Sequence, residues 1–159
     1  MKSVYFTIIL SAAILISGCS ARQIVTNEIA KNIVGVLDAQ YEANLKIEPA
    51  KNVEAAQYCL STSATVAAAV QTTGQLLNGY KTSVQGDTKS EAIAAQIGTL
   101  QSNLKNCAYV RCKNVAGDEV SALRNLAGAL GFNAGVEPPA DSCKKYEKLS
   151  REINKKVSK

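Results

Sequence analysis

The stretch Gly79-Tyr80-Lys81-Thr82-Ser83-Val84-Gln85-Gly86-Asp87 decides the fold, because it separates two long segments of helical periodicity. Its glycine, serine and aspartate residues are typical of a loop. Thr88-Lys89-Ser90-Glu91 follows with the spacing of a capping box, which marks the start of a helix. We therefore predict a loop over 79–87 and an antiparallel pair of helices around it.

Apolar residues on both sides of this loop recur at steps of three and four, which indicates helices. The helix before the loop is expected over about 49–80, with a seam of mostly small residues: Val53, Ala56, Leu60, Ser63, Ala67, Val70, Gly74 and Leu77. The helix after the loop carries Ile93, Ile97, Leu100, Leu104 and Cys107. Small seam residues let helices approach closely, and the many serines and threonines argue against a free coiled coil. A bundle interior is the better interpretation.

The segment before this hairpin predicts another helix, over about 22–46. Its apolar stripe consists of Val25, Ile29, Ile33, Val36, Leu37, Tyr41 and Leu45. Glu48-Pro49 should interrupt it, because the residue before a proline is pushed away from the helical conformation. After the hairpin, residues 108–116 are predicted to be a cysteine-containing connector.

Two shorter helices complete the prediction. Asp118 is the expected N-cap of a helix that Gly131 ends, with the apolar residues Val120, Leu123, Leu126, Ala127 and Leu130. Residues 133–140 are predicted to be a loop. Asp141 or Ser142 should cap a last helix, whose apolar face is Tyr146, Leu149, Ile153 and Val157. The fold class is therefore all-α, a bundle of four to five helices in a single domain.

The N-terminal segment has the parts of an export signal. Lys2 supplies a positive charge, and residues 4–16 form an apolar run interrupted only by Thr7 and Ser11. Such a run is too short to span a bilayer comfortably. The sequence Ile16-Ser17-Gly18-Cys19 then resembles the lipobox of bacterial lipoproteins at all four positions.

This resemblance implies that residues 1–18 are a signal peptide and that Cys19 becomes the lipidated N-terminus of a periplasmic domain, 19–159. Two or three acyl chains such as palmitate would anchor the chain firmly. Ser20, rather than aspartate, implies the periplasmic face of the outer membrane; a Gram-positive host would imply the outer face of the plasma membrane. The alternatives are a secretory signal with a coincidental cysteine and an uncleaved anchor helix.

Setting Cys19 aside leaves an even number of cysteines: Cys59, Cys107, Cys112 and Cys143. In an oxidising compartment this number predicts two disulfides. A four-cysteine metal site is the alternative, but the sequence has neither close CxxC pairs nor any histidine. We therefore expect disulfides and no metal.

The predicted hairpin suggests which cysteines pair. If the loop is centred on residue 83, Cys59 and Cys107 lie at equal distances along the chain on either side of that centre. Both would then lie at the same height on adjacent helices, where Cα atoms can come within about 7 Å. We favour Cys59–Cys107 with Cys112–Cys143. The next choice is Cys59–Cys112 with Cys107–Cys143, and the local pairing Cys107–Cys112 is third.

The positive charge is concentrated at the C-terminal end. Without Lys2 the net charge falls from +5 to +4, and the segment from Lys144 onward holds seven basic and two acidic residues. Within it, Lys144, Lys148, Arg151 and Lys155 share one helix face. The simplest interpretation is the solvated face of a docked helix. The functional one is a contact with anionic headgroups, lipopolysaccharide phosphates or an acidic partner.

The sequence contains no catalytic constellation. Histidine, the commonest general base, is absent, and no glycine-rich phosphate loop or GxSxG serine is present. The acidic pairs Asp38 with Glu42 and Asp118 with Glu119 are explained by a solvated helix face and a helix cap. We therefore expect no enzyme and no cofactor, and export makes nucleic acid an unsuitable partner.

These features favour a non-enzymatic binding or scaffold module with a protein partner in the envelope. The architecture resembles that of pilotins, small helical lipoproteins that carry an outer-membrane subunit of a secretion system. The alternatives are an exclusion, immunity or inhibitor lipoprotein, acting against phage, conjugation or a wall-degrading enzyme, and a purely structural envelope component.

Overall fold

The computed structural model contains the central antiparallel hairpin, formed by α2 (Val53–Ser83) and α3 (Thr88–Ala116). Three further helices accompany it: α1 (Lys2–Leu45), α4 (Val120–Ala129) and α5 (Ser142–Val157). The structure describes residues 2–47, 53–116, 120–133 and 135–159, with side chains from Ala21 onward except Ala116. Within these ranges the fold is all-α, as predicted, without strands. The predicted interruption at Glu48-Pro49 and the Asp118 cap lie outside the described residues.

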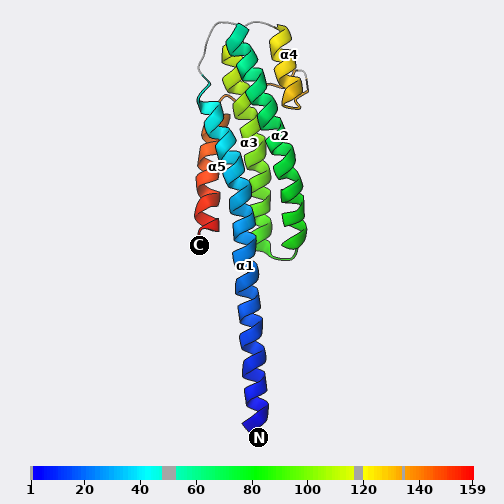
Figure 1. The fold of residues 1–159 in the computed structure, drawn as a ribbon, viewed down its shortest axis with the longest axis vertical. Coiled ribbons are helices and arrows are strands. Elements are labelled where there is room, and N and C mark those ends of the chain that lie inside the picture. Colours follow the sequence, from blue (N-terminus) through cyan, green and yellow to red (C-terminus); the bar gives the residue numbers. More distant parts are fainter. Residues whose placement is uncertain (1, 48–52, 117–119, 134) are drawn as a thin grey trace.

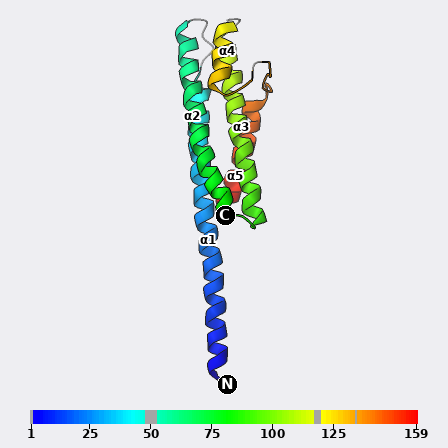
Figure 2. The same ribbon diagram turned by 90° about the vertical axis from the view of Figure 1, so that its right-hand side faces the viewer.

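The bundle is elongated, and its two ends differ. Figure 1 shows α1, α2, α3 and α5 side by side, with the N-terminal part of α1 projecting from one end. We call this the basal end. The α2–α3 loop and the C-terminus of α5 lie toward it, whereas α4 packs against α2 and α3 at the opposite, distal end (Figure 2).

The first helix is longer than the predicted 22–46, because it continues without a break from Lys2. Residues 2–21 contain no proline and consist mostly of apolar residues that a helix accepts, so nothing in the sequence stops it. The predicted end, near Lys46, is confirmed. In the described part of the chain, no helix combines the length and apolarity needed to cross a bilayer.

The α2–α3 loop is shorter than predicted, since α2 continues through Gly79 to Ser83. Burial explains the extension, since Tyr80 in this last turn and Val84 directly after it are both part of the hydrophobic core. The Thr82 hydroxyl donates to the Asn78 carbonyl at 3.0 Å, so a polar side chain is satisfied within the helix. The loop is therefore only 84–87.

The cap of α3 is displaced by one residue from the predicted capping box. Asp87, not Thr88, is the N-cap: its carboxylate accepts from the Lys89 N–H at 3.2 Å and from the Ser90 hydroxyl at 2.7 Å. Glu91 reaches back as predicted, but it accepts from the Gly86 N–H, at 2.8 Å. The hydrogen bond from Ser90, followed by that from the Lys89 N–H, holds the pKa of Asp87 below its usual value.

The third helix is the centre of the core and also contains the segment predicted as a connector. It contacts each of the other four helices. Its predicted apolar residues are all buried: Ile93, Ile97, Leu100, Leu104 and Cys107. Residues 108–116 continue the helix because Ala108, Cys112 and Val115 extend the same buried stripe.

The core-facing stripes of α1 and α2 are rotated from the predicted ones. On α1, Val25 is 59% and Val36 is 44% exposed, and Ile29 and Leu45 are also exposed. Thr26, Ala30, Val34 and Asn44 are buried with Ile33, Leu37 and Tyr41 instead. On α2, Val53 is exposed, and the buried residues are Cys59, Ser63, Val66, Thr73, Leu77 and Tyr80. Cys59 therefore lies in the core, although the predicted seam passed through its neighbour Leu60.

The serines and threonines of α2 do not disrupt the helix because most of their hydroxyls donate to backbone carbonyls of the preceding turn. Ser63 donates to the Cys59 carbonyl at 2.8 Å, and Thr73 donates to the Ala69 carbonyl at 2.8 Å. Thr73 also accepts from the Gln101 amide at 2.9 Å, which links α2 to α3 inside the bundle. A polar segment can thus serve as a core helix.

Two disulfides staple the helices, and the pairing first favoured from the sequence is wrong. Cys59 bonds Cys112 between α2 and α3, with Cα atoms 5.5 Å apart. Cys107 bonds Cys143 between α3 and α5, with Cα atoms 4.6 Å apart. This was the second choice. The error came from the loop, because the observed loop is centred between Gln85 and Gly86, and Cys59 and Cys112 are the cysteines equidistant from that centre.

The end of α4 follows the prediction, whereas the burial expected for Val120 at its beginning is wrong. Gly131 has a φ of 71°, and the Phe132 N–H donates to the Ala127 carbonyl at 2.8 Å, which closes the helix as a left-handed glycine cap. Leu126 and Leu130 are buried, but Val120 is 68% exposed. The last helix begins at Ser142, as predicted, with Asp141 as an N-cap that makes no side-chain capping bond.

Candidate functional site

The basic face predicted on the last helix is present on α5. Lys144, Lys148, Arg151 and Lys155 are all exposed, while Tyr146, Ile153 and Val157 are buried on the other side. The face extends along the bundle, since the helix from Lys144 to Lys155 rises about 16 Å. Only its last residue therefore lies toward the basal end, and a surface touching that end would not reach Lys144.

The buried side of α5 is held to α1 by a polar contact that the sequence did not reveal. Asp38 accepts hydrogen bonds from the Tyr146 hydroxyl at 2.7 Å, the Ser150 hydroxyl at 2.8 Å and the Asn154 amide at 3.3 Å. The solvated face expected for Asp38 is thus wrong. The signal was the i, i+4, i+8 spacing of Tyr146, Ser150 and Asn154, which places three donors on one line.

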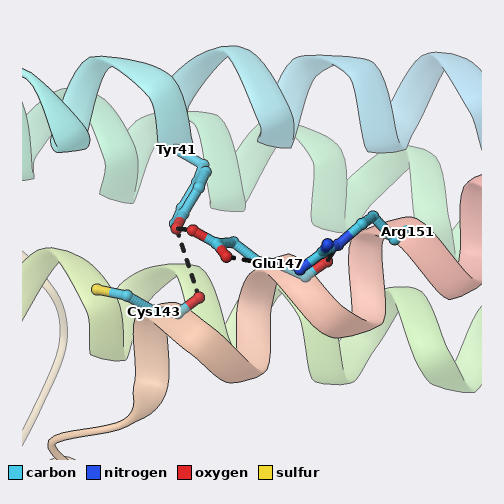
Figure 3. Close-up of polar contacts among 4 residues, drawn as sticks. All are labelled: Tyr41, Cys143, Glu147 and Arg151. Atoms are coloured by element: carbon cyan, nitrogen blue, oxygen red, sulfur yellow. Dashed lines mark hydrogen bonds and ion pairs between the residues drawn. The ribbon is translucent and has the colours of Figure 1, made fainter.

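A second polar contact lies one turn further along α1 (Figure 3). The Tyr41 hydroxyl donates to Glu147 Oε1 at 2.6 Å, and the Cys143 carbonyl lies 3.5 Å away. Arg151 lies 3.6 Å from the other Glu147 oxygen. The Tyr41 and Tyr146 rings stack with centroids 4.4 Å apart. Together these contacts fix the rotation of α5 about its own axis and its position along α1.

Alkaline conditions should loosen this contact between α1 and α5. Burial, followed by the hydrogen bond to a carboxylate, raises the pKa of both Tyr41 and Tyr146 well above the ordinary value. A phenol whose pKa is raised in the folded state keeps its contribution to stability below the unfolded pKa of about 10 and loses it above. We expect the free energy of unfolding to fall above about pH 10.

Titration of single variants checks this expectation. The free energy of unfolding is measured with denaturant from about pH 9 to pH 12. Tyr146→Phe should make its decrease with pH less steep, by up to about 1.4 kcal/mol per pH unit. Tyr41→Phe should act in the same direction. Parallel slopes in the wild type and in both variants would show that these phenols do not couple to folding.

The four cysteines that follow Cys19 are paired in disulfides, so none of these four offers a free thiolate. Among the side chains that the structure describes, no group of three or more cysteine, aspartate or glutamate residues is placed to hold a metal ion.

A cleft of about 420 Å³ opens at the distal end between α3 and α4. Its lining is mostly apolar and aromatic: Tyr109, Val120, Leu123, Ala127 and Phe132, with Arg124 as the charged member. Tyr109 and Phe132 meet edge to face at 5.6 Å, and Lys105 Nζ lies 5.5 Å from the Phe132 ring. An apolar cleft beside two cationic side chains suits an apolar side chain of a partner that also carries acidic residues.

The basal end carries a second group of basic residues, which overlaps the basic face of α5 only at Lys155. Arg22, which follows Cys19 closely, donates from Nη2 to the Ser83 carbonyl at 2.6 Å and so fixes α1 to the end of α2. A cleft of about 400 Å³ at this end is lined by Lys89, Glu152, Lys155, Lys156 and Lys159. Of the predicted basic face, only Lys155 belongs to it. The sequence could not have assigned Lys89 to this cleft, since it is far along the chain from the other three lysines of the lining.

Comparison with known proteins identifies no relative. No protein-family model matches the chain, and neither a curated protein nor a solved structure matches it significantly.

Proposed function

We propose that the chain is a lipid-anchored lipoprotein of the outer membrane, whose bundle is a non-enzymatic binding or scaffold module on the periplasmic face. One observation carries the proposal. Four of the five cysteines pair with one another inside the bundle, and the fifth is Cys19, directly after Ile16-Ser17-Gly18. A thioether bond to a lipid would leave this remaining cysteine without a free thiol, which suits an oxidising compartment.

The course of α1 supports a short connection between lipid and bundle. The helix continues through Cys19 into the bundle, and Arg22 already contacts α2. If processing leaves Cys19 as the first residue, the anchor is attached at the basal end. The distal cleft between α3 and α4 then faces away from the membrane, where a partner can reach it.

The lipid anchor is tested by metabolic labelling with a palmitate analogue. The wild type should incorporate the label and sediment with membranes, whereas Cys19→Ala should lose the label completely, because its side chain cannot form the thioether. Ser20→Ala, next to the modified residue, serves as the matched control and should keep the label. Label retained in Cys19→Ala would contradict the proposal, wherever that variant sediments.

The binding role is tested by photocrosslinking in the lipidated protein. A crosslinker at Val120, which is exposed in the lining of the distal cleft, should capture a partner from the envelope. The same crosslinker at Leu76, which is 53% exposed and outside the cleft, is the control. Capture of an outer-membrane subunit supports the pilotin-like role, and capture of a wall-degrading enzyme supports an inhibitor. Equal or no capture at both positions contradicts a binding role for the cleft.

A further inference from the structure

We propose that the basal lysine cluster, Lys89, Lys155, Lys156 and Lys159, rests on the anionic phosphate headgroups of the leaflet that holds the lipid anchor. This inference depends on the proposed anchoring at Cys19 and adds a second, electrostatic contact to it. It also replaces the contact surface that the sequence suggested, since Lys144, Lys148 and Arg151 lie outside the cluster.

The cluster is assembled from two helices that are distant in the sequence. Lys89 belongs to the first turn of α3, Lys155 and Lys156 belong to the last turn of α5, and Lys159 lies two residues beyond that helix. All four line one cleft of about 400 Å³, in which Glu152 is the acidic member of the lining. Lys156 Nζ donates to the Gln96 amide oxygen at 3.0 Å, so the last turn of α5 is held against α3.

The charges of the cluster are available for an external partner. All four lysines are exposed, and none of them forms an ion pair with the side chains that the structure describes. By contrast, Lys145 and Arg151, further from the basal end on the same helix, pair with Asp141 at 3.1 Å and Glu147 at 3.6 Å. Four lysines therefore line this cleft with a single carboxylate, that of Glu152, and the Asp87 carboxylate lies beside Lys89 outside the lining.

The position of the anchor selects a membrane as the partner. Arg22 is fixed to Ser83 at the end of α2, and Cys19 lies less than one helical turn before Arg22. A lipid on Cys19 would thus hold the basal end within reach of the headgroups, where a lysine side chain acts over about 8 Å at physiological salt. Each lysine held near an anionic surface strengthens the association about fivefold. A second anchor of this kind would orient the bundle, with the distal cleft pointing outward.

The test is a lysine acetylation footprint of the full-length lipidated protein, reconstituted in vesicles and read by mass spectrometry. In vesicles with one third phosphatidylglycerol, the four cluster lysines should react several-fold more slowly than in vesicles of phosphatidylcholine. Lys144, Lys145 and Lys148 should react equally in both. Raising the salt to about 1 M, where charges act over only about 3 Å, should abolish the protection. Equal reactivity of the cluster in both vesicle types would overturn the proposal.

A pair of triple variants separates a specific surface from general basicity. Lys155→Gln with Lys156→Gln and Lys159→Gln removes three charges from the cluster. Lys144→Gln with Lys145→Gln and Lys148→Gln removes the same charge from the same helix outside it. The first variant should lose most of the protection of Lys89, and the second should keep it. Equal loss in both variants would overturn the assignment to these residues.

A third arm separates a membrane surface from a site for free phosphate. Inorganic phosphate added to the detergent-solubilised protein should protect none of the four lysines. Protection by phosphate at millimolar concentration would overturn the membrane assignment. Failure of the anchor itself is read separately, because a protein without lipid takes up no palmitate label. A labelled protein with unprotected lysines refutes this inference alone.

Discussion

Replacing Cys59 and Cys112 together by alanine is expected to lower the free energy of unfolding by about 4 kcal/mol. The bridge closes a loop between residues 53 apart in the sequence, so in the chain-entropy model its loss frees a large part of the unfolded chain. Both cysteines are buried, and their replacement also removes a contact of the Ser63 hydroxyl with Cys112 Sγ at 3.3 Å. The contribution is a large share of the roughly 5–15 kcal/mol that stabilises an ordinary domain.

The second bridge provides the comparison. Cys107 and Cys143 are 36 residues apart, so their joint replacement by alanine should cost slightly less, still about 4 kcal/mol. Reduction of both bridges should then leave little or no folded protein at 37 °C. Denaturant unfolding followed by circular dichroism, with thiol labelling to prove complete reduction, measures both effects. An unfolding curve that does not change after complete reduction would refute this account of the stability.

The disulfide pairing shows where sequence reasoning lost accuracy. The rule that residues at equal distances from a hairpin loop lie side by side is correct, and it selects Cys59 with Cys112 once the loop is 84–87. Glycine and serine suggested that the loop began at Gly79. The decisive contacts, the burial of Tyr80 and Val84, are tertiary and cannot be read from local composition.

The buried face of α1 was in part predicted wrongly, for a different reason. Its sequence offers two apolar faces, one with Val25, Ile29 and Val36 and one with Ala30 and Val34, and both are connected by helical steps. Packing against α2, α3 and α5 selected the second, in which buried Asn44 and Thr26 are also included. By contrast, α3 has a single apolar stripe, and every residue predicted for it is buried.

The candidate site was predictable only in part. The exposed lysines of α5 follow from periodicity, because the apolar residues of that helix determine which side is buried. Their approach to Lys89 depends on how α5 lies against α3, which is a property of the whole bundle. The distal cleft likewise requires the position of α4 on α3, and the sequence predicted Val120 on the buried side.

Replacing Asp38 by alanine is expected to lower the free energy of unfolding by about 3 kcal/mol. The change leaves the Tyr146 hydroxyl, the Ser150 hydroxyl and the Asn154 amide without their carboxylate acceptor. Tyr146 is buried, so its hydroxyl cannot turn to water without moving the ring that stacks on Tyr41. A buried donor that loses its partner costs about 1–3 kcal/mol, more when the partner is charged. Asp38→Asn keeps one acceptor oxygen and should lose about half as much.

Glu42 provides the matched control, since it is an exposed carboxylate one turn from Asp38 on the same helix. Glu42→Ala should change the free energy of unfolding by less than about 0.5 kcal/mol, as is usual for surface positions. The mechanism is tested by adding Tyr146→Phe to Asp38→Ala. If Asp38 acts through the Tyr146 hydroxyl, the double variant should lose about 1 kcal/mol less than the sum of the single losses. Strict additivity would mean that the carboxylate stabilises α5 through its other two donors, and equal losses for Asp38→Ala and Glu42→Ala would refute the contact between α1 and α5 altogether.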